Sequence, residues 1–244
     1  MKKRLTYNSY LGGTKQVLET SRVEKEKYFV EILGKKFIVH PNVFSPKYFH
    51  DTEFFAANLP VHKHDCVLEI GPGTGVISIE AAYKGACRVI AIDINPTAVK
   101  NTQENVALHH LGKIIAVRKG DLFKALSTDE KFDVIFWNTP FGLIENDTKI
   151  SDLEKAVFDP GYDATERFIK QAHRYLTGDG NIFIGFSSAL GRLDLVKKFV
   201  QEANLSIKLI AETKSRETHP VRFELYKLER CWKPTQAEAV YQPL

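Results

Sequence analysis

The sequence predicts an α/β protein built on a doubly wound, seven-stranded sheet, with a small β-hairpin extension near the N-terminus. Two observations support this. From Cys66 onward, short apolar runs alternate with helical patterns, as in a chain of strand–helix–strand units. These runs are apolar almost throughout, which is expected of parallel strands that helices cover on both faces.

The expected elements follow the chain in order. Residues 28–33 and 37–39 flank a turn at Gly34 and predict the hairpin. A helix is expected from Asp51 or Thr52, either of which can act as N-cap, and Pro60 ends it. Sheet strands are expected at 66–70, 88–92, 114–118, 133–137 and 181–186, with two closing strands near 206–213 and 221–228. Helices are expected at 75–84, 96–109, 164–176 and 191–203, the third ending at Gly178 as its C′ glycine.

The chain divides into three expected parts: an N-terminal arm and hairpin over 1–50, a main domain over 51–230 and a tail over 231–244. Within the first part, residues 1–27 are expected to form an arm or a short helix. The first 50 residues carry ten Lys/Arg against four Asp/Glu. This excess fits an anionic partner such as RNA, and it equally fits a solvated segment.

Composition excludes several classes of protein. Hydrophobic residues make up 43% and charged residues 26%, as in ordinary globular domains. No apolar run approaches the roughly 18 residues of a membrane span, and no apolar h-region follows Lys2-Lys3-Arg4. The three cysteines, Cys66, Cys87 and Cys231, share no CxxC spacing. We therefore expect a cytoplasmic protein with no metal site, disulfide framework or membrane partner.

A glycine-rich stretch after the first sheet strand predicts a nucleotide or nucleoside site. Gly71, Gly73 and Gly75 allow a sharp turn that leads into a helix N-terminus. The glycines alone fit either a dinucleotide or a nucleoside. Glu69, two residues before them, would repel a pyrophosphate but not a ligand with an ammonium or sulfonium group. This favours S-adenosylmethionine (SAM) over NAD.

Two later acidic residues fit the same ligand. Asp93 ends the second strand, about 20 residues after the glycines, where a carboxylate can accept both ribose hydroxyl protons. The alternative is a role in starting the helix at Asn95-Pro96. Asp121 follows the third strand and can accept a hydrogen bond from the adenine amino group, or it is a plain turn residue.

The fourth strand ends in Asn138-Thr139-Pro140-Phe141, beside the expected crevice. The Asn138 amide oxygen and the Thr139 backbone carbonyl can together accept two N–H bonds from a planar NH₂ group. They would hold its nitrogen towards a methyl donor and stabilise positive charge as it develops. Phe141 would stack on a flat substrate. The alternative is a loop amide beside a core aromatic ring.

With these residues in hand, the chain resembles the class I SAM-dependent methyltransferases. More narrowly, it is similar to the small-domain methyltransferase superfamily that includes the HemK/PrmC-type glutamine methyltransferases. The resemblance covers roughly residues 28–228. It rests on five matches: Leu68–Gly75, Asp93, Asp121, Asp51-Thr52-Glu53 and Asn138–Phe141. Residues 156–163 match more loosely. Thr139 departs from it, because the family usually has proline there. Pro140 still restrains Thr139 to extended conformations.

The resemblance implies a Rossmann-like sheet, SAM as cofactor, and methyl transfer to an amide or exocyclic amine nitrogen. Protein glutamine and nucleic-acid adenine are the favoured acceptors. A small-molecule acceptor, a non-catalytic SAM- or RNA-binding module and an NAD-dependent oxidoreductase remain alternatives. The acceptor-site residues are Asn138, Thr139, Pro140 and Phe141. The cofactor-site residues are Thr52, Glu69, Gly71, Pro72, Gly73, Thr74, Gly75, Asp93, Ile94, Asp121, Leu122 and Asn138.

Overall fold

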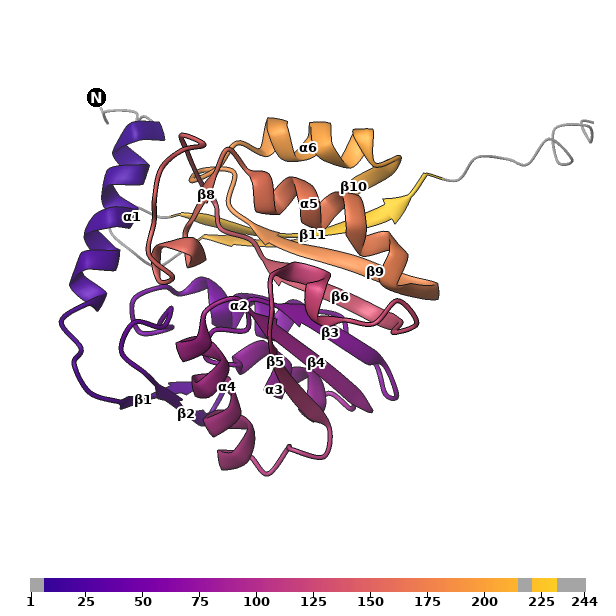
Figure 1. Ribbon diagram of the computed structural model, residues 1–244, viewed down its shortest axis with the longest axis horizontal. Helices are drawn as coiled ribbons and strands as arrows, with labels where there is room; N and C mark the ends of the chain where they lie inside the picture. Colours follow the sequence, from indigo (N-terminus) through magenta and orange to yellow (C-terminus); the bar gives the residue numbers. More distant parts are fainter. Residues whose placement is uncertain (1–6, 215–220, 232–244) are drawn as a thin grey trace, which may run out of the picture.

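The computed structural model describes residues 7–214 and 221–231 (Figure 1). Its centre is a seven-stranded sheet with the order β10-β11-β9-β6-β3-β4-β5. The five strands from β9 to β5 run parallel, and β11 and β10 continue the sheet antiparallel. These strands are β3 Cys66–Ile70, β4 Arg88–Asp93, β5 Ile115–Lys119, β6 Phe132–Asn138, β9 Leu176–Phe186, β10 Leu205–Lys214 and β11 Arg222–Arg230. The predicted fold class is confirmed.

Helices pack against both faces of this sheet. The α-helices are α1 Tyr7–Ser21, α2 Asp51–Asn58, α3 Val76–Tyr83, α4 Pro96–Leu108, α5 Asp163–Ala172 and α6 Leu193–Glu202. Three short 3₁₀ turns are η1 Leu122–Ala125, η2 Glu154–Ala156 and η3 His173–Tyr175. Two small ladders complete the fold: β1 Tyr28–Ile32 with β2 Lys35–Val39, and β7 Gly142–Ile144 with β8 Phe158–Pro160.

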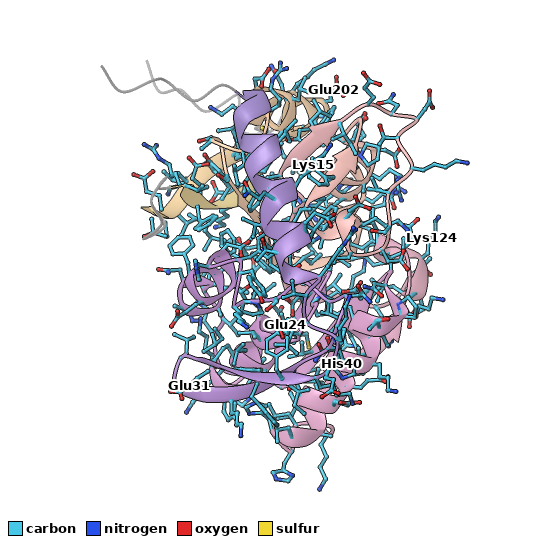
Figure 2. The ribbon with its side chains drawn as sticks, turned by 90° about the vertical axis from the view of Figure 1, so that its left-hand side faces the viewer. Lys15, Glu24, Glu31, His40, Lys124 and Glu202 are labelled. Atoms are coloured by element: carbon cyan, nitrogen blue, oxygen red, sulfur yellow. The ribbon has the colours of Figure 1, made fainter. Side chains whose placement is uncertain are left out.

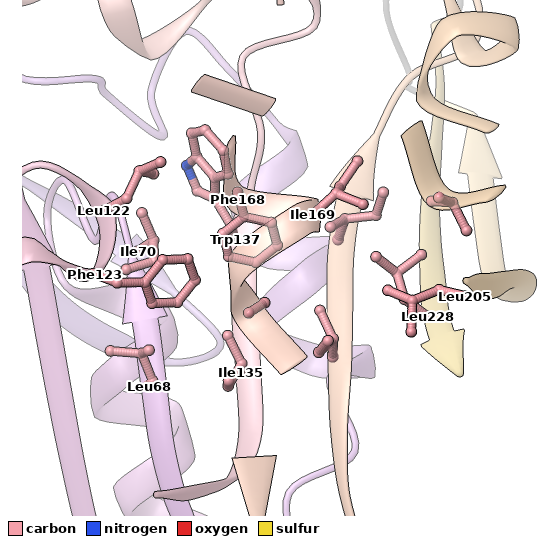
Figure 3. Close-up of a cluster of buried hydrophobic side chains, with 14 of the residues drawn as sticks. Leu68, Ile70, Leu122, Phe123, Ile135, Trp137, Phe168, Ile169, Leu205 and Leu228 are labelled. Atoms are coloured by element: carbon pink, nitrogen blue, oxygen red, sulfur yellow. The ribbon is translucent and has the colours of Figure 1, made fainter. Parts of the chain in front are cut away.

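Alternate residues of each central strand enter two separate buried clusters, because successive side chains point to opposite faces. On one face, Leu68, Ile70, Ile135 and Trp137 pack with residues of α5 and α6, and Figure 3 shows this cluster. On the other face, Val67, Val134 and Phe136 pack with residues of α2 and α3. Burial on both faces explains why the strands read as continuous apolar runs.

The predicted β1–β2 hairpin is present and belongs to the second face. Tyr28 pairs with Val39 and Ile32 with Lys35 around the turn at Leu33-Gly34. Phe37 is fully buried within the cluster that contains α2 and α3.

The strand order places the site. The order in which the chain adds strands reverses at β3. The chain first adds β4 and β5 on one side of β3, and then adds β6 and β9 on the other side. In open α/β sheets a ligand binds in the crevice at the carboxyl ends of the strands beside such a switch point. Ile70, Asp93 and Asn138 end the three strands that border it.

Two sequence expectations are wrong. Gly178 does not end a helix: α5 stops at Ala172, η3 follows, and residues 176–186 are all strand. Pairing with β6 recruits this stretch, since Leu176 lies opposite Phe132 across a bulge. Helix α2 is not capped by Asp51 or Thr52 either. Its N-cap is His50, and Asp51 lies in the first turn with its carboxylate turned to Asn138.

Of the two forms expected for residues 1–27, an arm or a short helix, the structure has a helix, α1, which is 15 residues long. Helix α1 lies across one side of the molecule, carrying Lys15 in Figure 2. Its Leu18 is buried with Leu153, Val157 and Phe158. Within the described ranges no helix has the length and apolar character needed to cross a membrane. The basic cluster at 2–4 and, apart from Cys231, the expected tail at 231–244 lie outside the described residues.

Candidate active site

The glycine-rich turn between β3 and α3 adopts the left-handed conformations that its sequence predicts. Gly71, Gly73 and Gly75 have φ of 64°, 58° and 81°, a region that side chains with a Cβ rarely adopt. The Gly71 N–H donates to Ile92 O at 2.8 Å, which ties the turn to β4. A Cβ added to Gly71 would also lie 3.2 Å from Trp137 Nε1, a tight contact that the indole ring would have to relieve by a small shift.

This turn borders a cavity of about 510 Å³, within the roughly 300–1,000 Å³ of cofactor sites. Eleven of the twelve expected cofactor residues line it: Thr52, Glu69, Gly71, Pro72, Gly73, Thr74, Asp93, Ile94, Asp121, Leu122 and Asn138. Gly75 does not line the cavity. It faces away, where an added Cβ would lie 2.7 Å from Thr102 Cγ2.

The cavity has an apolar floor and a polar rim. Ile70, Leu122 and Trp137 line it and also belong to the buried cluster of Figure 3, so the floor rests on packed core. Ile92 lies beside them. An apolar surface with a few placed polar groups suits a nucleoside with a flat base.

Glu69 and Asp93 are two of the buried acids that line this cavity, and Asp159 is another. The Asp93 carboxylate accepts the N–H of Gly73 at 3.1 Å and that of Asn95 at 2.9 Å, so it also fastens the turn to β4. Glu69 accepts a hydrogen bond from the Ser78 hydroxyl. Burial raises the pKa of Glu69 to about 7, although Ser78 opposes this. Burial likewise raises the pKa of Asp93 to about 6, against the N–H groups of Asn95 and Gly73.

The structure assigns the N-cap of α4 to Asn95 rather than to Asp93, and the ribose role of Asp93 stays a prediction. Asn95 is the N-cap of α4, and its side chain accepts from Thr97 N at 2.8 Å, with Pro96 in the first turn. Asp93 precedes this cap and faces the cavity. Each carboxylate oxygen retains a second lone pair for a ligand hydroxyl beside the N–H that it already accepts.

Asp121 has partners that the sequence analysis did not identify. Arg167 on α5 donates to its two oxygens at 3.1 and 3.2 Å, and Lys124 Nζ lies 2.8 Å away. Burial raises the pKa of Asp121, but the hydrogen bonds from Lys124 and Arg167 outweigh it and leave that pKa below its usual value. Arg167 also lines the cavity. Asp121 is therefore part of an ion-pair cluster at the cavity rather than a lone carboxylate.

Asn138 is hydrogen-bonded to another buried acid, Asp51. Its amide Nδ2 donates to Asp51 Oδ2 at 2.8 Å, across 87 residues of sequence. The remaining oxygens of the pair, Asn138 Oδ1 and Asp51 Oδ1, are buried without a hydrogen-bond partner among the described residues. Burial raises the pKa of Asp51, although the hydrogen bond from Asn138 opposes it. Two unpartnered acceptors are costly unless a ligand supplies donors.

Gly185 on β9 leaves space for this pair. An added Cβ there would lie 2.9 Å from Asn138 Oδ1 and 2.7 Å from the ring of Phe55. Thr139 is held by the same strand, since both its N–H and its hydroxyl donate to Gly185 O, at 3.2 and 2.8 Å. The extra hydroxyl bond gives this position a restraint that the usual proline would lack.

A second cavity, of about 840 Å³, meets the first at Asn138, which lines both. Asp51, Thr139 and Phe141 line it, whereas Pro140 lines the first cavity. The Phe141 ring packs edge-on against Phe186, with ring centroids 5.7 Å apart. One further wall comes from α1, through Gly12, Gly13, Thr14, Gln16, Val17 and Thr20.

The segment between β7 and β8 covers the first cavity and supports α1. Asn146, Ile150 and Leu153 line the cavity from this segment. On its other side Leu153 packs against Leu18 of α1, and Arg22 Nη2 lies 3.7 Å from Glu154 Oε2. Helix α1 and this segment thus form one wall beside both cavities.

Comparison with known proteins identifies this arrangement. A family model described as the methyltransferase small domain matches residues 34–210. The chain belongs to this family. It is a methyltransferase that depends on SAM, and the expected cofactor is confirmed at the level of the family.

Individual relatives agree with the family. The methyltransferase is 35% identical over 207 residues to a protein of Methanocaldococcus jannaschii that is provisionally named a protein N5-glutamine methyltransferase, covering 84% of this chain and 98% of that protein. A ribosomal protein L11 methylase of Lactobacillus delbrueckii superposes with a TM-score of 0.55 at 21% identity, over 79% of this chain and 83% of that one. The tRNA m1G37 methyltransferase of M. jannaschii gives a TM-score of 0.60 at 19% identity, over 86% and 56% of the two chains. These two structures establish the fold.

Sequence reasoning missed three parts of the site. It treated Asp51 as a helix cap, and it did not single out Arg167. It also did not predict that α1 would line the second cavity. The sequence did offer a signal for Asp51, because this acidic residue directly precedes Thr52, which was already expected to contact the cofactor. Neither Arg167 nor α1 carries a local pattern that points to the site.

Proposed function

We propose that this methyltransferase transfers the methyl group of SAM to the side-chain carboxamide nitrogen of a glutamine in a protein acceptor. The observation that carries the proposal is the pair of unpartnered buried oxygens, Asn138 Oδ1 and Asp51 Oδ1. A primary carboxamide presents two N–H donors on one nitrogen, so it matches two acceptors. The name of the M. jannaschii relative supports the same class of acceptor.

SAM supplies an electrophilic methyl group on a sulfonium centre. Gly71, Gly73 and Thr74 would hold the cofactor against the turn, and Thr52 would contact its methionine end. Asp93 would accept the ribose hydroxyls, and Asp121 with Ile94 and Leu122 would border the adenine. The Glu69 carboxylate would favour the cationic end of the ligand. The volume of the cavity supports this assignment, and so does its apolar floor, which Ile70 and Trp137 help to form.

On the acceptor side, Asn138 and Asp51 would act by orientation. Their oxygens accept the N–H bonds of the incoming nitrogen, which directs its lone pair towards the first cavity, and they stabilise the positive charge that develops on it. As the new N–C bond forms and the C–S bond of the sulfonium breaks, the nitrogen would lose one proton. Of the two acceptor oxygens, Asp51 Oδ1 is the one that belongs to a carboxylate and could receive it. Its raised pKa increases its proton affinity. The Thr139 carbonyl and Phe141 would border the remainder of the carboxamide.

The second cavity favours a polypeptide over a nucleic acid as the carrier of this group. Within the described ranges, the charged or titratable side chains that line it are Lys47, Tyr48, His50 and Asp51. Lys47 is already paired with Glu24. A polynucleotide backbone needs several cationic contacts, whereas an uncharged peptide segment does not.

The experiment is methyl transfer from labelled SAM into cell extract, followed by complete proteolytic digestion, which leaves side-chain amides intact, and identification of the labelled amino acid. We expect N5-methylglutamine, and label in nucleic acid or in small molecules would refute the proposal. In Asn138→Ala we expect incorporation to fall by about 10²–10³-fold, the loss typical of a missing transition-state contact. The circular dichroism spectrum and melting temperature of the same variant should stay close to those of the parent and show that the variant is folded.

A further inference from the structure

Three polar side chains on one side of α4 are completely buried, although none of them belongs to the expected site. Asn101, Thr102 and Asn105 have no exposed surface. Burying an amide or hydroxyl without hydrogen bonds is costly, so such groups normally have defined partners. Here the partners lie in two separate parts of the chain: the glycine-rich turn and the β1–β2 hairpin.

Towards the turn, these side chains hold two consecutive carbonyl groups. The Thr102 hydroxyl donates to Gly73 O at 3.0 Å, and Asn105 Nδ2 donates to Thr74 O at 2.8 Å. The C=O and N–H of a trans peptide unit point in opposite directions. Anchoring Gly73 O on α4 therefore turns the N–H of Thr74 away from α4, and Thr74 lines the cofactor cavity.

Towards the hairpin, the two asparagines take the place of a strand partner for β2. Asn105 Oδ1 accepts from Ile38 N at 2.7 Å, and both amide nitrogens donate to Ile38 O at 2.7 Å. Asn101 Oδ1 accepts from His40 N at 2.8 Å. The edge of β2 that faces away from β1 is thereby hydrogen-bonded to a helix rather than to another strand.

Asn105 is the side chain that the two sets of contacts share. Its single amide bonds to Ile38 of the hairpin and to Thr74 of the turn, while Asn101 bonds to the hairpin alone. We propose that Asn105, together with Thr102, is a positioning residue for SAM: it fastens the glycine-rich turn to α4 in the conformation that binds the cofactor, and it couples that turn to the N-terminal hairpin. This role is independent of the acceptor's identity.

Asn101 provides a matched control for this proposal. Asn101→Ala and Asn105→Ala change the same residue type, one helical turn apart, and each removes hydrogen bonds to β2. Only Asn105→Ala leaves a carbonyl of the turn unpaired. Thr102→Val removes the bond to Gly73 O with almost no change of shape, so the packing against Gly75 is kept.

The test measures SAM binding by calorimetry in the full chain, with hydrogen exchange at the amides of Ile38 and His40. Both alanine variants should speed exchange in the hairpin and lower the melting temperature. Asn105→Ala should weaken SAM binding about tenfold, as expected when a buried carbonyl loses its donor. Thr102→Val should weaken it less, and Asn101→Ala should leave it unchanged.

Two results would overturn the proposal. One is an equal loss of SAM affinity in Asn101→Ala and Asn105→Ala, which would mean that affinity only follows general stability. The other is unchanged affinity in both Asn105→Ala and Thr102→Val. If Asn105→Ala does not fold, Thr102→Val still decides, because the loss of one hydroxyl at constant volume preserves the fold. Methyl transfer is not the readout, so failure here is distinct from failure of the proposed function.

Discussion

The two cavities that meet at Asn138 are built in different ways. The cofactor cavity is organised by one short stretch, Glu69 to Gly75, with Asp93 about 20 residues later at the end of the neighbouring strand. The acceptor cavity joins α1, the residues before α2, the end of β6 and the start of β11, which span most of the chain. The first is shaped mainly by local backbone geometry, and the second by side chains that packing brings together from distant elements. Substitutions should therefore separate into those that affect SAM and those that affect the acceptor.

After Asn138→Ala, the largest expected effect is also on the acceptor side, in Asp51→Asn. An amide at this position places one NH₂ group either against Asn138 or against the incoming carboxamide, so a donor faces a donor in both orientations. We expect methyl transfer to fall about 10- to 100-fold, corresponding to about 1–3 kcal/mol. SAM affinity should change little. A comparable loss of SAM affinity, measured by calorimetry, would remove the distinction between the two cavities.

Asp93→Asn should produce the opposite pattern. The substitution removes the charge that would accept the ribose hydroxyls, and it weakens the bonds to the N–H groups of Gly73 and Asn95. We expect the Kd for SAM to rise about 10- to 30-fold, in the range of charged hydrogen bonds. The turnover rate at saturating SAM should remain near that of the parent. A fall in that rate without a change in Kd would contradict the assignment.

SAM binding should tighten as pH rises, because the ligand favours ionised Glu69 and Asp93. With the pKa of Glu69 raised to about 7 in the free protein, affinity should increase about tenfold between pH 6 and pH 8 from this group alone. Asp93, with a pKa of about 6, adds a smaller increase over the lower part of that range. Calorimetry in buffers of different ionisation enthalpy should detect proton release near pH 6–7. In Glu69→Gln only the step near pH 6 should remain.

The same raised pKa has a consequence for the stability of the protein without SAM. A carboxyl group with a higher pKa in the folded than in the unfolded chain binds its proton more tightly when folded. For Glu69 this stabilisation is complete below the ordinary glutamate pKa of 4.5 and is lost as pH rises through about 7. Thermal unfolding across that range should show the decline, and Glu69→Gln should flatten it.

The smallest expected effect tests the wall formed by α1. Gly12 and Gly13 lie inside this helix, where each glycine costs about 1 kcal/mol relative to alanine. Both line the second cavity, and an added Cβ at Gly12 meets no atom within 4 Å. Gly12→Leu should therefore stabilise the helix while narrowing the cavity, which raises the KM for the acceptor several-fold. Gly12→Ala is the matched control: it should stabilise similarly and leave that KM almost unchanged. Equal KM values for the two variants would exclude this wall from acceptor binding.

Residues 66–138 illustrate how much of the protein follows from local pattern. The strands at 66–70 and 88–92 were predicted to within one residue, because continuous apolar runs between turn signals leave few alternatives. The positive φ values of Gly71 and Gly73, the N-cap at Asn95 and the place of Asn138 at the end of β6 follow from the same signals. Gly178 marks the limit of this approach. It resembled a helix end, but pairing with β6 drew it into a strand.

The sequence alone determined the type of sheet, the glycine-rich turn, the buried acids around it and the family to which these belong. Each depends on residues close in the chain, where backbone geometry and side-chain periodicity act directly. Tertiary structure decided the contacts between distant residues: Asp51 with Asn138, Arg167 with Asp121, and Asn105 with both Ile38 and Thr74. No local signal encodes such pairs, because they depend on how separate elements pack across the sheet. The acceptor side is assembled largely from contacts of this kind.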